Sequence, residues 1–292
     1  MAIHQVRASG LDYLRLVTEL LQRARLTDSE AGLWEAADLQ WWWRMARRSD
    51  SIEQLFWIDD GEPVAGVVLT DWDRAWGCDP IVVRGASTVP LATIWERAVE
   101  SIDALGLKAV HVLARDDDVE LVGLLAGAGF VADDDRSGIT WMDAGDRPDV
   151  TALPDGFALV DRARETSSPH PMRRRNGEEV ERRLRQCSLY DPSLDLAVEA
   201  PSGDVAGYAL FWFDPVTEVG LVEPMRVEDA YQRRGLARAM LTEGLERLAR
   251  RGARRLKVGY GSETGRRLYV GAGFRVTSTS RSYSWTRSSS TS

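Results

Sequence analysis

Apolar residues recur along the chain at two spacings, one typical of helices and the other of strands. Between Leu11 and Arg25 the apolar side chains return about every three to four residues, which predicts an amphipathic helix. Short apolar runs flanked by turn residues predict strands, and Asp59-Asp60-Gly61-Glu62 between two such runs predicts a hairpin. The two patterns alternate over the whole length, which indicates an α/β fold.

The predicted elements fall into two similar series. Those of the first half are helices at 11–25, 94–105 and 121–128, a helix that begins after Thr27-Asp28-Ser29-Glu30 and carries Trp34 and Trp41–Trp43, and strands at 55–58, 64–69, 81–83, 109–113 and 139–142. Those of the second half are strands at 157–160, 194–198, 205–213, 217–225, 255–258 and 282–286, and helices at 177–186, 235–251 and 265–270.

The second half also repeats residues of the first. Gly106-Leu107-Lys108-Ala109-Val110-His111-Val112 corresponds to Gly252-Ala253-Arg254-Arg255-Leu256-Lys257-Val258, and Gly127-Ala128-Gly129-Phe130 corresponds to Gly271-Ala272-Gly273-Phe274. A stretch rich in Asp, Gly and Pro lies between the halves, at residues 143–154. We therefore expect tandem domains at 1–145 and 153–287, and a disordered Ser/Thr-rich tail at 287–292.

The composition is ordinary for a globular protein, with 44% hydrophobic and 28% charged residues among 292. No apolar run approaches the about 18 residues of a membrane span, and the N-terminus lacks the layout of a signal peptide, so we expect a cytoplasmic protein without a membrane partner. Cys78 and Cys187 are expected to be free thiols. No histidine belongs to a nucleophile motif and no metal-ligand spacing is present, so we expect no bound metal.

A glycine-bearing turn before the helix predicted at 235–251 carries the clearest chemical signal: Gln232-Arg233-Arg234-Gly235-Leu236-Ala237. Such a turn directs several backbone N–H groups to one point, and the helix N-terminus adds a positive potential of about half a charge. Arg and Lys crowd residues 233–257, although the formal net charge of the chain is -8. This local basicity indicates a bound anion such as a pyrophosphate rather than a polyanion.

The turn resembles the Q/R-x-x-G-x-G/A signature of the GNAT acetyltransferase superfamily. Downstream, Ser262-Glu263-Thr264-Gly265-Arg266-Arg267-Leu268-Tyr269 followed by Gly271-Ala272-Gly273-Phe274 is similar to the family's N-x-x-A-x-x-L-Y…GF block, with Ser262 in place of Asn and Gly265 in place of Ala. The resemblance covers about residues 195–285. It implies two tandem GNAT-like domains, each a mixed, mostly antiparallel sheet flanked by helices, in a layout similar to that of mycothiol synthases.

The resemblance further implies that acetyl-CoA binds as the acyl-donor substrate. Its pyrophosphate is expected at the turn, and its pantetheine arm is expected to pair with backbone groups of the fourth strand. The residues expected to bind acetyl-CoA are Met225, Arg226, Val227, Gln232, Arg233, Arg234, Gly235, Leu236, Ala237, Arg238, Ser262 and Arg266.

The first half resembles a degenerate copy of this domain. Ala86-Ser87-Thr88-Val89-Pro90-Leu91 stands where the second half has its glycine and arginines, and Leu125 stands where it has Tyr269. A turn with Val89 in place of glycine approaches a phosphate less closely and supplies no counter-charge. We therefore expect 1–145 to be non-catalytic, with a structural role or as a wall of the acceptor pocket, and 153–287 to be catalytic.

Acetyl transfer requires a neutral amine, a polarised carbonyl and a protonated leaving thiolate. Tyr269 is the candidate acid, because the tyrosine of this block lies near the sulfur in the family; the alternative is a core aromatic. Glu223 is the candidate base, because it stands in an apolar run and before Pro224, which suggests a bulge that splays this strand from its neighbour. The alternatives are a strand-end carboxylate that faces solvent or pairs with Arg226, with Glu218 or Glu199 as the base.

The function expected from these features is acetyl-CoA-dependent transfer of an acetyl group to a small-molecule primary amine, by direct attack in a ternary complex. The alternative is a non-catalytic acyl-CoA-binding or regulatory module. The run Arg173–Arg175 is short and lacks interleaved aromatic residues, so nucleic acid is not an expected partner. Trp41–Trp43 are interpreted as core and interdomain packing. The acceptor and the choice between monomer and homodimer stay open.

Overall fold

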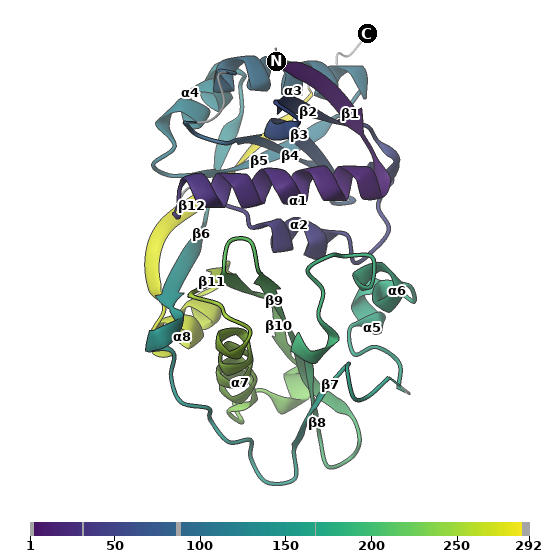
Figure 1. The fold of residues 1–292 in the computed structure, drawn as a ribbon, viewed down its shortest axis with the longest axis vertical. Helices are drawn as coiled ribbons and strands as arrows, with labels where there is room; N and C mark the ends of the chain where they lie inside the picture. Colours follow the sequence, from purple (N-terminus) through teal and green to yellow (C-terminus); the bar gives the residue numbers. More distant parts are fainter. Residues whose placement is uncertain (1–2, 31, 86–88, 167, 288–292) are drawn as a thin grey trace. The chain divides into compact units, whose positions relative to one another are not determined.

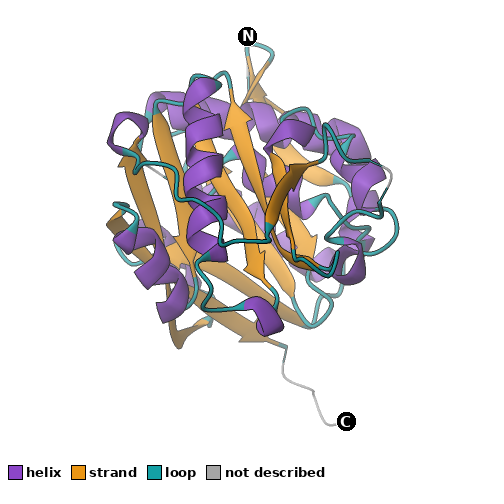
Figure 2. Cartoon of the chain, turned by 90° about the horizontal axis from the view of Figure 1, so that it is seen from below, coloured by secondary structure: helices purple, strands orange, loops and turns teal. Residues whose placement is uncertain are grey.

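The chain divides into two compact units in the computed structural model, which describes residues 3–30, 32–85, 89–166 and 168–287 (Figure 1). The first unit comprises Met1–Leu39, Ala46–Ser137 and Ser278–Ser292, and the second comprises Gln40–Met45 and Gly138–Thr277. Each unit contains strands flanked by helices (Figure 2), so the predicted α/β class is confirmed. The segments 86–88 and 288–292, for which a degenerate turn and a disordered tail were predicted, lie outside the described residues.

The first unit is a mixed sheet in the order β1-β2-β3-β4-β5-β12, in which only β4 and β5 pair in parallel. Helix α1 packs against β3, and α3 packs against β3 and β4. The apolar faces of these elements form one core cluster. Its elements are β1 (His4–Ala8), α1 (Gly10–Thr27), β2 (Gln54–Asp59), β3 (Glu62–Asp71), β4 (Trp76–Val82), α3 (Leu91–Ala104), β5 (Ala109–Arg115) and α4 (Val119–Gly127).

The second unit has the same plan, with the order β7-β8-β9-β10-β11-β6 and a single parallel pair, β10 with β11. Helix α7 packs on β8, β9 and β10, and α8 packs on β11. A second core cluster fills the space between them. The elements are β7 (Ala158–Asp161), α5 (Arg173–Asn176), α6 (Val180–Leu184), β8 (Asp195–Glu199), β9 (Val205–Asp214), β10 (Val219–Val227), α7 (Leu236–Arg250), β11 (Arg255–Tyr260) and α8 (Glu263–Gly271).

The last strand of each half completes the sheet of the other unit. In β6 (Val131–Asp143), residues from Gly138 onward pair with β11, and in β12 (Arg275–Thr286), residues from Ser280 onward pair with β5. Compact packing therefore divides the chain differently from the predicted domains at 1–145 and 153–287. Periodicity identifies a strand but not its partner, because an apolar strand face can be buried on either sheet.

Local predictions agree with the structure where turn residues set the backbone. Asp60 and Gly61 have φ values of 53° and 85° and close the β2–β3 hairpin, while Gly106 and Gly129 follow α3 and α4 with φ values of 61° and 80°. The helix predicted after Thr27 is wrong in extent: α2 is Ala36–Trp42, and Trp34 precedes it. The helix predicted at 177–186 is likewise replaced by α5 and α6, which Gly177 separates with a φ of 88°.

A buried carboxyl group, that of Asp79, lies in the first unit. Its Oδ1 accepts a hydrogen bond from the Trp34 Nε1–H at 2.8 Å, and the residue is 7% exposed. Burial raises the pKa of Asp79 from 3.8 to about 6, and the Trp34 hydrogen bond offsets this only in part. The Tyr13 phenol and the Cys78 thiol are near the same charge, and burial raises the pKa of both, so neither supplies a counter-charge.

We expect the Asp79→Asn variant to gain stability over the wild type as the pH rises. Because the folded pKa lies above the unfolded one, the stabilisation from protonated Asp79 is complete below pH 3.8 and is lost as the pH rises through about 6. The shift corresponds to about 3 kcal/mol. Denaturant unfolding at pH 4 and pH 7.5 measures the difference in unfolding free energy between the wild type and Asp79→Asn. The Asp134→Asn variant, at an exposed position, is the control. An equal difference between wild type and variant at both pH values would contradict the prediction.

Candidate functional site

Strands β10 and β11 separate halfway along β10. They pair from Val219 with Arg255 to Leu221 with Lys257, although β10 continues to Val227 and β11 to Tyr260. On its other side β10 pairs with β9, and the register shifts between Val222 and Met225. The bulge predicted from Pro224 is therefore present. Along the last part of β10, the edge that faces β11 is left unpaired among the described strands and can bind an extended ligand by its backbone.

The turn between β10 and α7 is built from residues with left-handed backbone. Arg233 has a φ of 61° and Gly235 a φ of 83°, and α7 begins directly afterwards at Leu236. Gly235 occupies the N-cap position and no side-chain hydrogen bond caps this described helix end, so its first N–H groups remain available. Backbone donors and the helix dipole together make this end an anion-binding position.

Side chains around the turn are exposed and mostly cationic. Gln232 holds the turn through a hydrogen bond of 3.1 Å from its Nε2 to Asp229 Oδ1. The Arg234 guanidinium lies 5.7 Å from the centroid of the Tyr231 ring, and Arg238 donates to the Gly271 carbonyl at 3.3 Å. Arg233 is also exposed, so three guanidinium groups lie near the N-terminal end of α7.

Tyr269 lies on α8 and is 9% exposed, with its ring edge-on to Phe274 at a centroid distance of 6.2 Å. Burial and, to a smaller extent, the negative charge of Glu223 raise the pKa of its phenol to about 12. The phenol therefore carries its proton throughout the neutral range and lies within electrostatic reach of Glu223. A hydroxyl that keeps its proton at neutral pH can act as a proton donor.

Glu223 lies at the bulge of β10, joined to Pro224 by a cis peptide bond. Its backbone carbonyl accepts a hydrogen bond of 2.7 Å from the indole Nε1–H of Trp212. The alternative carboxylates lie elsewhere on the sheet. Glu218 precedes β10, about 16 Å along the strand from Glu223, and pairs with Arg254 at 2.9 Å. Glu199 ends β8 and pairs in the ladder with Ala158 of β7.

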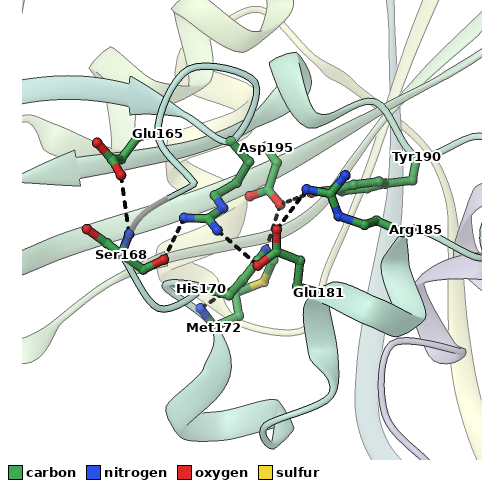
Figure 3. Close-up of polar contacts among 9 residues, drawn as sticks. Glu165, Ser168, His170, Met172, Glu181, Arg185, Tyr190 and Asp195 are labelled. Atoms are coloured by element: carbon green, nitrogen blue, oxygen red, sulfur yellow. Dashed lines mark hydrogen bonds and ion pairs between the residues drawn. The ribbon is translucent and has the colours of Figure 1, made fainter.

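A buried polar cluster supports Trp212, and the sequence did not reveal it. The Tyr190 ring meets the Trp212 ring edge-on at 6.3 Å, and the Tyr190 hydroxyl donates to Asp195 Oδ2 at 2.8 Å. His170 Nε2 is also 2.8 Å from that oxygen, and its Nδ1 accepts from the Met172 N–H, so Nε2 carries the proton (Figure 3). These residues stand at separate positions in the chain and form no motif, so only the fold assembles them.

Three other predicted binding residues have partners within the protein. Ser262 caps α8, with its Oγ accepting from the Gly265 N–H at 3.2 Å. Arg266 donates to both oxygens of Glu263 at 2.6 and 2.9 Å, and Arg226 lies 3.5 Å from Glu228 and 3.4 Å from Asp229. Ser262 and Arg266 belong to the start of α8 and Arg226 to the end of β10. Their contribution to ligand binding stays a prediction.

Among the described residues, no group of three or more His, Cys, Asp and Glu side chains is placed to hold a metal ion. Within the same residues, each helix is too short or too polar to cross a membrane.

Part of the chain matches a known family, and its fold is similar to that of solved structures. Residues 160–274 match the acetyltransferase (GNAT) family, and no curated protein matches the sequence. A tandem GNAT protein from the clavulanic acid biosynthesis pathway, solved without acetyl-CoA, is 15% identical over 99% of this chain and 100% of its own, with a TM-score of 0.70. A GCN5-related N-acetyltransferase from Sphaerobacter thermophilus is 19% identical over 97% of this chain and 95% of its own, with a TM-score of 0.62.

At identities of 15% and 19%, the likeness to these solved structures shows a shared fold only. A GCN5-related N-acetyltransferase from Kribbella flavida gives a TM-score of 0.53 at 15% identity, over 90% of this chain and 95% of its own. The matched GNAT family generally uses acetyl-CoA as a substrate. Residues 160–274 therefore form an acetyltransferase (GNAT) family domain, in a chain that has the fold of tandem GNAT proteins.

Proposed function

We propose that the second unit transfers an acetyl group from acetyl-CoA to a small-molecule primary amine, by direct attack within a ternary complex. The observation that carries this proposal is the open edge of β10, with Glu223 on that strand and Tyr269 within the electrostatic influence of Glu223. A phenol with a pKa of about 12 holds its proton, and a carboxylate close to it can accept one. A proton donor and a proton acceptor together suit a reaction that consumes a proton at one atom and releases one at another.

Backbone and arginine groups would bind the acyl donor. The turn at 232–238 offers N–H donors and three guanidinium groups to the pyrophosphate. Met225 to Val227 offer backbone groups on the side of β10 that β11 leaves unpaired, so the pantetheine arm can bind there as an added strand. A backbone N–H of this segment would polarise the thioester carbonyl as negative charge develops on its oxygen.

Proton transfers at Glu223 and Tyr269 would complete the reaction. An alkyl amine with a pKa near 10 is only about 0.1% neutral at pH 7, so Glu223 would remove its proton, directly or through water. The amine nitrogen then forms a bond to the acetyl carbon while the carbon–sulfur bond breaks. Tyr269 would donate its proton to the departing thiolate.

Thiol release from acetyl-CoA, measured across a panel of primary amines, tests the proposed function. Amine-dependent release with one acetylated product per thiol supports it. Binding of coenzyme A without release for any acceptor would instead favour a non-catalytic acyl-CoA-binding module. Failure to bind coenzyme A would refute both.

We expect the Glu223→Gln variant to lose about 100-fold in kcat/KM for the amine at pH 7. The loss should shrink toward pH 10, because the amine then deprotonates without a base. The affinity for coenzyme A should stay unchanged, because Glu223 would act on the acceptor amine and not on coenzyme A. Glu218→Gln is the matched control at the other end of the strand. A pH profile of the Glu223→Gln variant that parallels the wild type would exclude the base role.

We also propose that the first unit does not catalyse this reaction. Leu125, which is fully buried, stands at the position of Tyr269 and offers no proton. Helix α3 begins after Pro90 rather than after a left-handed glycine. The losses expected for variants of the second unit should therefore appear in full in the intact chain, without a residual rate from the first unit.

A further inference from the structure

A cavity of about 300 Å³ lies within the first unit. The end of α1, the segment that follows it, β4, the end of β5 and the starts of α3 and α4 contribute its described wall. This volume is at the lower end of the range for small-molecule pockets. Most of the wall is apolar, including Leu21, Leu33 and Leu121.

The cavity occupies the place in the first unit that the open strand edge occupies in the second. The parallel pairing of β4 with β5 ends at Gly77 and His111, as the pairing of β10 with β11 ends at Leu221 and Lys257. Two residues beyond each final pair come Asp79-Pro80 and Glu223-Pro224 respectively. The two carboxylates are thus equivalent in register. Asp79 lines a cavity, however, and no tyrosine comparable to Tyr269 is among the described residues that line it.

Charge in the cavity wall disfavours an anionic ligand such as coenzyme A. Its three arginines are already paired: Arg25 with Glu35 at 2.6 Å, Arg84 with Asp118 at 3.1 Å and Arg115 with Asp117 at 2.6 Å. The wall also contains the carboxylates Asp28, Asp79, Asp118 and Glu120. Carboxylates therefore outnumber cations around the cavity.

Asp79 differs from these carboxylates because its side chain is buried and no cationic side chain pairs with it among the described residues. Its hydrogen bond comes from the neutral indole of Trp34, and both Trp34 and Asp79 are among the residues that line the cavity. An ionised carboxylate that is 7% exposed and has no counter-ion costs free energy, which its raised pKa also reflects. A ligand that brings one positive charge and an apolar body would remove this cost.

We infer that the first-unit cavity binds a small organic cation, a primary ammonium on a compact apolar body, with the ammonium on the Asp79 carboxylate. The three N–H donors of an ammonium suit a carboxylate oxygen that faces a cavity. The aliphatic side chains Leu21, Leu33 and Leu121 would surround the apolar body. Binding here is separate from acetyl transfer in the second unit.

Isothermal titration of the intact protein with 2-phenylethylammonium tests this site, with the isosteric neutral alcohol 2-phenylethanol as the matched ligand. We expect the ammonium to bind at least about tenfold more tightly than the alcohol. Asp79→Asn, which keeps an oxygen for the Trp34 hydrogen bond, should remove this preference, whereas Asp134→Asn should keep it. Equal affinities for the two ligands in the wild type would overturn the inference.

Two further measurements separate this cavity from the amine site proposed in the second unit. Glu223→Gln should keep the ammonium affinity that Asp79→Asn loses, and Asp79→Asn should still release thiol from acetyl-CoA. Loss of ammonium binding in Glu223→Gln but not in Asp79→Asn would place the ligand in the second unit and overturn the inference. Displacement of the bound ammonium by coenzyme A in the Gly235→Val protein would also overturn it, because the cavity would then hold the acyl donor.

Discussion

Replacing Gly235 by valine is expected to weaken coenzyme A binding about 100-fold and to lower kcat/KM for acetyl-CoA by a similar factor. Gly235 has a φ of 83°, a conformation that a β-branched residue strongly disfavours. An added Cβ meets no described atom within 4 Å, so crowding inside the protein does not explain the demand for glycine. The new side chain would instead displace the pyrophosphate from the N–H groups at the start of α7. Loss of about two charge-assisted hydrogen bonds, worth about 3 kcal/mol, corresponds to the stated factor.

Gly203 provides a matched control for this substitution. It lies in the turn between β8 and β9 of the same unit, has the same φ of 83°, and also has no described atom within 4 Å of an added Cβ. Gly203→Val should therefore cost similar backbone strain, about 1–2 kcal/mol, without affecting coenzyme A. Titration calorimetry and denaturant unfolding of both variants separate the two effects. Equal coenzyme A affinity in the two variants would show that the 232–238 turn does not bind the pyrophosphate.

Replacing Tyr269 by phenylalanine is expected to lower kcat about 100-fold and to leave the affinity for coenzyme A unchanged. The substitution removes only the hydroxyl that would protonate the thiolate, a step worth about two orders of magnitude. The ring keeps its edge-on contact with Phe274, so the core should hold its structure. Steady-state kinetics with a saturating amine, together with a coenzyme A titration, measure the two quantities.

The pH dependence of the wild-type rate offers a second check on Tyr269. Because its pKa is raised to about 12, the phenol should stay protonated and kcat should not fall from its ionisation below about pH 11. Tyr283→Phe, a buried tyrosine of the first unit, is the control for loss of a hydroxyl. If kcat of Tyr269→Phe stays within about twofold of the wild type, Tyr269 is a core aromatic and the proton must come from another donor.

Glu223 shows how a site residue is predicted locally but positioned by distant contacts. A carboxylate before Pro224 in an apolar strand predicts a bulge, because proline lacks the N–H that a ladder needs. The contacts that hold this bulge come from Trp212 on β9 and, beyond it, from Tyr190, Asp195 and His170. Nothing in the local sequence around Glu223 indicates these partners.

The sequence by itself determined the features that depend on a few neighbouring residues. Helix and strand periodicity, the repeat between the halves, the hairpin at Asp60-Gly61 and the glycine-bearing turn at 232–237 all follow from local backbone preferences and side-chain spacing. The likeness of 232–237 and 262–274 to the GNAT signatures rests on the same local patterns. Each of these features depends on residues that are close in sequence and not on contacts with distant parts of the chain.

Only the tertiary structure decided which distant segments meet. It places the end of β6 beside β11 and the end of β12 beside β5, and it brings Trp34 to Asp79 at the wall of the first-unit cavity. An apolar strand can be buried on more than one sheet, and a polar side chain can find its partner on any element that the fold brings near. The choice depends on the free energy of burial summed over the whole core against the entropy of closing the connecting loops, and no short stretch of sequence contains that sum.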